Sequence, residues 1–138
     1  MPVYRCITPP DSIAQDVRAV IAEDITRIHC ELTSGTPRSF VHVIFEEVAP
    51  GRMFSGGTPS EKTLITGQIR AGRTAEVRTR LVQEISRAWN RATGQSEEDI
   101  LVAVTEFRAS DVVEGGIPLP EPGEEAGWLA AHGVGATT

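Results

Sequence analysis

Apolar residues recur at intervals of three and four between positions 17 and 32, and this spacing predicts a helix. The turn-forming segment 9–12 precedes it, and the segment Thr33-Ser34-Gly35-Thr36-Pro37 ends it. The β-rich run 40–45 predicts a short strand, and the apolar run 3–7 predicts an opening strand. The apolar face of the helix is formed by Val17, Val20, Ile21, Ile25, Ile28 and Leu32.

The same order of elements returns about 60 residues along the chain. The corresponding positions are Val17-Arg18 with Val77-Arg78, Ile25-Thr26-Arg27 with Ile85-Ser86-Arg87, and Thr33 with Thr93. The runs 63–69 and 100–105 match the two strands of the first unit in character. The chain is therefore predicted to consist of two β-α-β units, and a crossover helix makes the two strands of each unit parallel.

These elements predict an α/β fold (α+β in some schemes), with two fused β-α-β units forming one four-stranded mixed sheet and both helices on one face. We expect a single domain over 1–138, with unit one at about 2–48 and unit two at about 62–107. A loop or short hairpin crosses between the units, and a tail over 108–138 does not repeat. Its Trp128 is expected to dock, with a neighbouring subunit among the candidates. Since no helix covers the second face of the sheet, we also expect a closed homo-oligomer.

Composition and charge narrow the class of protein. A chain of 138 residues with 40% apolar and 23% charged residues predicts one globular domain. A net charge of −6 disfavours binding to nucleic acid, and neither a membrane-spanning run nor a secretory signal is expected. Cys6 and Cys30 lack metal-ligand spacing, so we interpret them as small buried or half-buried hydrophobes in a reducing cytoplasm.

Pro2 is the first candidate for chemistry, because removal of Met1 would turn its ring nitrogen into a free secondary amine. An α-amino group titrates at about 7.7–8.0, and burial or nearby cations lower that pKa into the range of a base at neutral pH. Alone, a proline at position 2 indicates no more than an ordinary strand start.

Three further features lie at the ends of the predicted elements. Arg70 and Arg73 flank the turn Ala71-Gly72 and could clamp a carboxylate. His29 could donate a hydrogen bond to substrate, and Glu114 could hold water or move a proton. Each has a structural alternative: solvated turn residues, a histidine that complements the helix dipole, and a surface glutamate. The sequence leaves open whether Pro2 and Arg70 meet.

The other ionisable groups point to no site. His42 lies in the middle of a predicted strand and is interpreted as structural, and His132 in the tail as solvent-exposed. No residue pair has metal-ligand spacing, and no glycine-rich loop matches a phosphate cradle, so we expect no metal and no cofactor.

With these residues assembled, the chain resembles the tautomerase superfamily, which has a MIF-like fold and an amino-terminal proline, and within it the cis-3-chloroacrylic acid dehalogenase family. The resemblance extends from Pro2 to Trp128. The matching motifs are Pro2-Val3-Tyr4, His29, Arg70-Ala71-Gly72-Arg73, Val113-Glu114-Gly115-Gly116, and Leu119-Pro120-Glu121-Pro122-Gly123 with Glu125 and Trp128.

The resemblance implies a homotrimer in which Pro2 acts as general acid or base. It also implies that Arg70, Arg73 and His29 bind the substrate carboxylate. The family activates water with a glutamate, here Glu114, and a tyrosine. Ala103 stands at the position of that tyrosine, and this departure puts water addition in doubt.

Three functions follow from these observations. The leading one is keto–enol tautomerisation of small 2-oxo or enol carboxylates such as phenylenolpyruvate. The second is dehalogenation or hydration of three-carbon unsaturated acids, including cis-3-chloroacrylate, with Glu114 alone activating water. The third is a non-catalytic oligomeric binding protein, which gains weight if Met1 is retained.

Overall fold

We describe residues 1–132 of a computed structural model. The main elements are β1 (Val3–Thr8), α1 (Gln15–Thr33), β2 (His42–Glu47), β5 (Thr63–Arg70), α2 (Ala75–Thr93) and β6 (Ile100–Phe107). The shorter elements are η1 (Arg38–Phe40), β3 (Phe54–Ser55), β4 (Thr58–Pro59), η2 (Glu97–Asp99), η3 (Ala109–Asp111), β7 (Val113–Glu114), β8 (Ile117–Pro118) and α3 (Glu125–His132).

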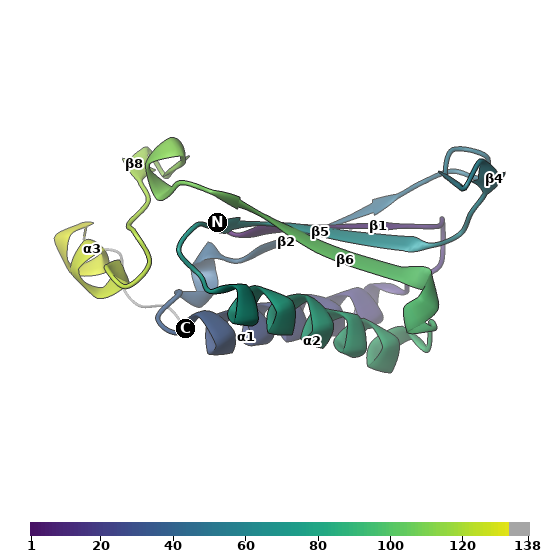
Figure 1. The fold of residues 1–138 in the computed structure, drawn as a ribbon, viewed down its shortest axis with the longest axis horizontal. Coiled ribbons are helices and arrows are strands. Elements are labelled where there is room, and N and C mark those ends of the chain that lie inside the picture. The colour runs from purple at the N-terminus through teal and green to yellow at the C-terminus, as the bar shows by residue number, and fades with distance from the viewer. Residues whose placement is uncertain (133–138) are drawn as a thin grey trace.

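The four long strands form one sheet in the order β2-β1-β5-β6. β1 and β2 pair in parallel, as do β5 and β6, while β1 and β5 pair antiparallel with Val3 opposite Gln68. Both long helices lie on one face of the sheet (Figure 1). The predicted fold is confirmed, and the antiparallel centre places the start of β1 beside the end of β5.

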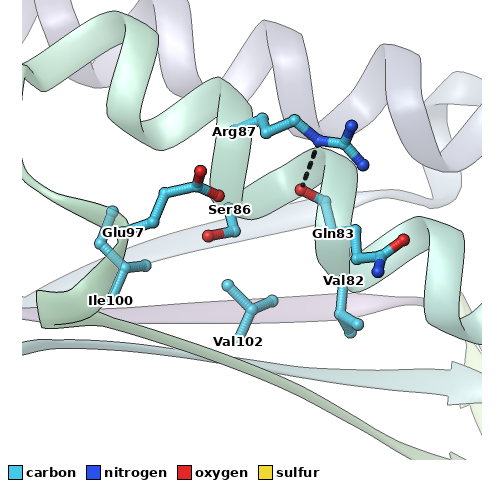
Figure 2. Close-up of a pocket in the computed structure, with 7 residues that line it drawn as sticks. All are labelled: Val82, Gln83, Ser86, Arg87, Glu97, Ile100 and Val102. Carbon is cyan, nitrogen blue, oxygen red and sulfur yellow. Dashed lines mark hydrogen bonds between the residues drawn. The ribbon is translucent and has the colours of Figure 1, made fainter.

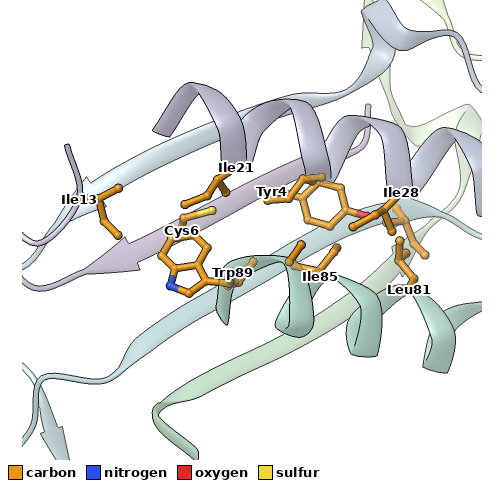
Figure 3. Close-up of a cluster of buried hydrophobic side chains, with 12 residues drawn as sticks. Tyr4, Cys6, Ile13, Ile21, Ile28, Leu81, Ile85 and Trp89 are labelled. Atoms are coloured by element: carbon orange, nitrogen blue, oxygen red, sulfur yellow. The ribbon is translucent and has the colours of Figure 1, made fainter. Parts of the chain in front are cut away.

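Alternate residues of the strands point toward the helices and form the main core. Trp89, Tyr4 and Ile85 are among its fully buried members (Figure 3). Burying one large apolar side chain stabilises the fold by about 1.5–3 kcal/mol. On the opposite face, Ile44 and Leu101 are 44% and 52% exposed, so this subunit leaves apolar surface uncovered.

The prediction of a non-repeating tail is wrong for its first part. The hairpin β7–β8 turns at Gly115-Gly116, just as β3–β4 turns at Gly56-Gly57. All four glycines have positive φ, between 58° and 82°, which is the region where glycine is favoured. The repeat was missed because two-residue strands carry almost no hydrophobic period.

The interpretation of His42 as a mid-strand residue is also wrong. The segment after Pro37 forms the turn η1, so β2 starts at His42 instead of at Phe40. His42 is therefore at the end of the sheet. Among residues 1–132, no helix is both long enough and apolar enough to cross a membrane.

Candidate active site

The amino terminus lies at one end of the sheet, close to the β7–β8 hairpin and the tail helix (Figure 1). The Met1 amine is 2.6 Å from Glu114 Oε1, and Pro2 behind it is fully buried. Burial lowers the pKa of the amine, the charge of Arg70 lowers it further, and the hydrogen bond to Glu114 opposes both. The net pKa lies below the ordinary value of 8.0.

Glu114 connects the amine to a histidine. Its Oε2 atom is 2.8 Å from His42 Nε2. Partial burial raises the pKa of the Glu114 carboxyl, but the hydrogen bonds from the amine and His42 outweigh burial, and the pKa is lowered overall. Glu114 is therefore held as a carboxylate between two nitrogen groups.

His29 faces this region from the last turns of α1 and is only 2% exposed. Its Nδ1 atom is 2.8 Å from the Tyr4 hydroxyl, which fixes the orientation of the imidazole ring. Burial lowers the pKa of His29 to about 3, assisted by the charges of Arg73, Arg70 and the amino terminus. His29 is thus neutral at physiological pH.

Arg70 and Arg73 lie side by side, as a carboxylate clamp requires. Both guanidinium groups reach Thr36 Oγ1, at 3.4 and 3.3 Å, and Arg73 also donates to the Thr33 carbonyl. Burial lowers the pKa of Arg73, as does the neighbouring charge of Arg70. The turn between them needs its glycine, because Gly72 has φ of 117° and lies against the tail at Pro122.

An internal carboxylate already occupies part of this clamp. Glu125, from the start of α3, is 4% exposed and is 2.8 Å from Arg70 Nη2 and 3.9 Å from Arg73 Nη2. Arg70 also donates to the Pro120 carbonyl at 2.7 Å. Arg70 is therefore an interior residue that binds the tail to the sheet, while Arg73 is the more accessible of the two.

A second apolar cluster forms the wall beside these polar groups. Its buried members are Phe40, Ala109 and Leu119, and Met1, Phe107, Val112 and Trp128 pack against them. Trp128 packs edge-on against Phe40, with ring centroids 5.6 Å apart, and donates to the Pro118 carbonyl. The tail tryptophan thus docks on its own chain, next to the site.

Two other sequence candidates lie elsewhere. Ala103 faces the uncovered side of the sheet, paired with Thr66 in the middle of the strands, and not at the end that holds the amine. His132 is exposed and its Nδ1 contacts the Trp128 carbonyl. Within residues 1–132, no group of three His, Cys, Asp or Glu side chains could hold a metal ion.

A hollow of about 580 Å³ opens between α2 and the beginning of β6, and Figure 2 shows the side chains around it. Its lining is Val82, Gln83, Ser86, Arg87, Glu97, Ile100 and Val102. It lies toward the start of β6, while the amine lies near the strand's other end. None of the predicted site residues lines it, so it is not the candidate active site.

The structure brings Pro2, His29, Arg70, Arg73 and Glu114 to one end of the sheet. Sequence reasoning missed two neighbours of these residues: His42, whose partner is 72 positions away, and Glu125, which was noted only as part of a tail motif. A histidine among β-branched residues carries no signal of such a contact. A glutamate after a proline-rich turn, such as Glu125, indicates a buried contact only if a buried cation is already expected.

Comparisons with known proteins agree with this fold. The family model described as "Putative oxalocrotonate tautomerase enzyme" matches residues 1–132. A solved structure of N1, a member of the cis-3-chloroacrylic acid dehalogenase family, is 32% identical with a TM-score of 0.89, over 93% of this chain and 90% of that one. The structure of native Ps01740 is 36% identical with a TM-score of 0.78, over 81% and 99% of the two chains.

A fused 4-OT, solved as a symmetric trimer, has a TM-score of 0.75 at 18% identity, over 84% of this chain and 94% of that chain, and shares the fold. No curated protein matches this chain. The family match over residues 1–132 and the likeness to N1 identify the chain: it belongs to the tautomerase superfamily and is similar to the cis-3-chloroacrylic acid dehalogenase family.

Proposed function

We propose that this protein is a tautomerase that interconverts the keto and enol forms of small 2-oxo carboxylates, with phenylenolpyruvate as a representative substrate. The observation that carries the proposal is the position of the amino terminus. The amine lies within hydrogen-bonding distance of Glu114, and its pKa also responds to the charge of Arg70.

The base would be the secondary amine of Pro2, formed when Met1 is removed. Pro2 is buried, so its nitrogen would become the chain terminus close to the present position of the Met1 amine. Burial and Arg70 lower the pKa of an amine at this place, which increases its neutral fraction near pH 7. A neutral amine can accept the hydroxyl proton of the enol and return it to the neighbouring carbon, so the reaction is a net isomerisation.

Substrate recognition would use charge on one side and apolar surface on the other. Arg73, with Arg70 behind it, supplies positive charge for the carboxylate, and neutral His29 can hydrogen-bond the 2-oxygen. The Met1 side chain packs against the cluster that contains Phe40 and Leu119. Removal of Met1 would free that wall for the apolar group of an aryl-substituted enol.

The test compares three forms of the protein in an ultraviolet assay of phenylenolpyruvate ketonisation: the chain beginning at Pro2, the chain retaining Met1, and Pro2→Ala. Loss of a positioned acid–base group lowers rates by about 10²–10⁴-fold, and we expect such a loss in Pro2→Ala. Retention of Met1 should also abolish activity, because the Pro2 nitrogen is then an amide.

Intact mass of each preparation establishes which terminus is present. The control is His132→Ala, which changes an exposed tail residue and should leave the rate unchanged. Full activity in Pro2→Ala would overturn the mechanism. Absence of ketonisation and of dehalogenation in the Pro2-initiated protein would favour a non-catalytic binding protein.

A second candidate function is hydrolytic dehalogenation or hydration of three-carbon unsaturated acids. The contact of Glu114 with the amine favours it, because water addition needs a base and an acid on the two carbons of the double bond. Ala103 offers no hydroxyl to assist. Chloride release from cis-3-chloroacrylate would detect this activity.

We also propose that the protein assembles as a homotrimer. Exposed Ile44 and Leu101 on the uncovered sheet face supply apolar surface to bury, and the fused 4-OT relative was solved as a trimer. Sedimentation analysis tests the assembly: a monomer at micromolar concentration would contradict it.

A further inference from the structure

His42 is held beside the amino terminus by the backbone. It begins β2 directly opposite Val3 of β1, and its N–H donates to the Pro2 carbonyl at 2.9 Å. Its imidazole is on the face of the sheet that the helices leave uncovered, and its side chain is 47% exposed. The ring is therefore outside the core, and packing alone does not explain its orientation.

The contact that orients the ring is with Glu114. The two carboxylate oxygens have different partners: Oε1 contacts the amine at 2.6 Å and Oε2 contacts His42 Nε2 at 2.8 Å. An ionised carboxylate only accepts hydrogen bonds, so Nε2 carries the hydrogen. The result is a chain of three groups, amine–Glu114–His42, drawn from Met1 ahead of β1, the β7–β8 hairpin and β2.

This chain of groups has consequences for the choice of reaction. Tautomerisation moves one proton through the amine and needs no second base. Water addition needs a carboxylate that is ionised and correctly oriented, because it must remove a proton from water while the amine protonates the other carbon. A hydrogen-bond donor on the far oxygen of Glu114 favours the ionised form, as the amine does, and fixes the orientation of the carboxylate.

We propose that His42 is a positioning residue that orients Glu114 for water addition to α,β-unsaturated three-carbon carboxylates, the second candidate function above, and that it serves this step without a hydroxyl at Ala103. The inference rests on the proposed role of Pro2. It concerns a different step, so the two can fail separately.

For cis-3-chloroacrylate the steps balance as follows. Glu114 takes a proton from water as the water oxygen bonds to the β-carbon, and the π electrons move to the α-carbon. The α-carbon takes a proton from the fraction of the Pro2 amine that is protonated. The chlorohydrin that forms loses chloride as its hydroxyl proton leaves and the carbonyl forms. The proton on Glu114 returns to Pro2. Besides the carbonyl product, the net reaction releases one chloride ion and one proton.

The experiment measures two rates on each protein that begins at Pro2: chloride release from cis-3-chloroacrylate and ketonisation of phenylenolpyruvate. His42→Ala should reduce chloride release by roughly 10- to 100-fold, since misplacing a reacting group by about 1 Å has an effect of this size. Ketonisation should change by less than about threefold. His42→Gln keeps an N–H donor and should recover most of the chloride release.

Arg5→Ala is the matched control. Arg5 lies on the same uncovered face and forms an exposed pair with Glu46, so this variant reports any general disturbance of the face or of assembly. It should leave the ratio of the two rates unchanged. Thermal unfolding of every variant checks that the exposed substitution leaves the fold intact.

Three outcomes overturn the inference and leave the proposed function in place. Wild-type protein that ketonises but releases no chloride removes the water-adding activity while leaving the proposed function in place. Equal loss of both rates in His42→Ala indicates a structural role. Unchanged chloride release in His42→Ala shows that Glu114 needs no partner. Absence of both activities in the wild type would instead remove the proposed function and this inference together.

Discussion

The two ends of the sheet are built alike and carry different chemistry. α1 and α2 have the same length and lie 60 residues apart, so His29 and Trp89 occupy equivalent positions near their ends. His29 is bonded to Tyr4 and surrounded by positive charge. Trp89 stacks on Phe45, with ring centroids 6.2 Å apart, and donates to the Gln95 side chain at 3.0 Å.

The difference continues in the segments before the helices. Arg73 precedes α2, whereas the equivalent position before α1 is the buried Ile13. Glu125 and Trp128 have no counterpart, because only the second unit is followed by a tail helix. A repeated scaffold thus becomes asymmetric where the amino terminus, the tail and two arginines meet. At the other end, the contacts around Trp89 are aromatic packing and a neutral hydrogen bond, and the Arg18–Glu47 ion pair is partly exposed.

The largest effect should come from Glu125→Ala, which leaves Arg70 buried without its carboxylate. Breaking a buried ion pair by removing one partner destabilises a protein by about 3–5 kcal/mol, and both side chains here are almost fully buried. Glu47→Ala is the control, since the Arg18–Glu47 pair at the opposite end is partly exposed and such pairs contribute about 0–1 kcal/mol. Urea unfolding measures both; a change below about 1 kcal/mol in Glu125→Ala would show that Arg70 finds another partner.

Lowering the pH should destabilise the folded protein, because buried His29 is held neutral at the end of the sheet that carries the candidate active site. Its pKa is about 3 in the folded protein and 6.5 as the model value, so between these values the unfolded chain binds the proton that the folded chain excludes. The contribution of neutral His29 to the free energy of unfolding is fully present above pH 6.5. Below that pH it falls by up to about 1.4 kcal/mol per pH unit, so the loss reaches roughly 2–3 kcal/mol by pH 4.5.

His29→Gln removes this titration, so its unfolding free energy should vary less between pH 6.5 and 4.5 than that of the wild type. The Glu114 carboxyl affects stability at lower pH. Because its pKa is lowered in the folded protein, it stabilises the fold above pH 4.5, the ordinary value, and this stabilisation is lost as the pH falls toward the pKa of the folded state. Parallel curves for wild type and His29→Gln would contradict the assignment.

A smaller effect is expected from Gly67→Ala, which tests the contact between Tyr4 and His29. A methyl group at Gly67 would lie 2.4 Å from Tyr4 Cε1, so the ring must move. Overpacking of this kind destabilises by about 1–3 kcal/mol, and displacement of the Tyr4 hydroxyl should also lower ketonisation. Thr66→Ala, one residue earlier on the outer face, is the control. Unchanged stability and activity in Gly67→Ala would mean that the ring shifts freely.

The smallest effect on stability compares two equivalent arginines. Arg18 pairs with Glu47 and Arg78 pairs with Glu106, both partly exposed, so alanine at either should change stability by no more than about 1 kcal/mol. Only Arg78 also donates to the Arg73 carbonyl. Ketonisation should therefore fall several-fold in Arg78→Ala and stay constant in Arg18→Ala, and equal rates would show that the Arg73 turn is stable without this bond.

The sequence by itself determined the two β-α-β units and most of the buried side of α1, and it proposed the candidate groups for chemistry. These follow from periodicity and residue type, which are local properties. Val20 was predicted on the buried side of that helix, but it is 52% exposed. The 60-residue offset and the motif around Pro2, Arg70, Arg73 and Glu114 were sufficient for the family, which the comparisons then showed.

Only the tertiary structure decided which of these groups meet. The antiparallel pairing of β1 with β5 places the amine at the end of the sheet that holds Arg70. The direction in which the two units pair depends on the core that they share, and neither segment alone specifies it. The contacts of Glu114 with His42 and of Arg70 with Glu125 join residues 72 and 55 positions apart. Such contacts leave no periodic trace in the chain, since a charged residue at the surface and one facing a distant partner look the same in sequence.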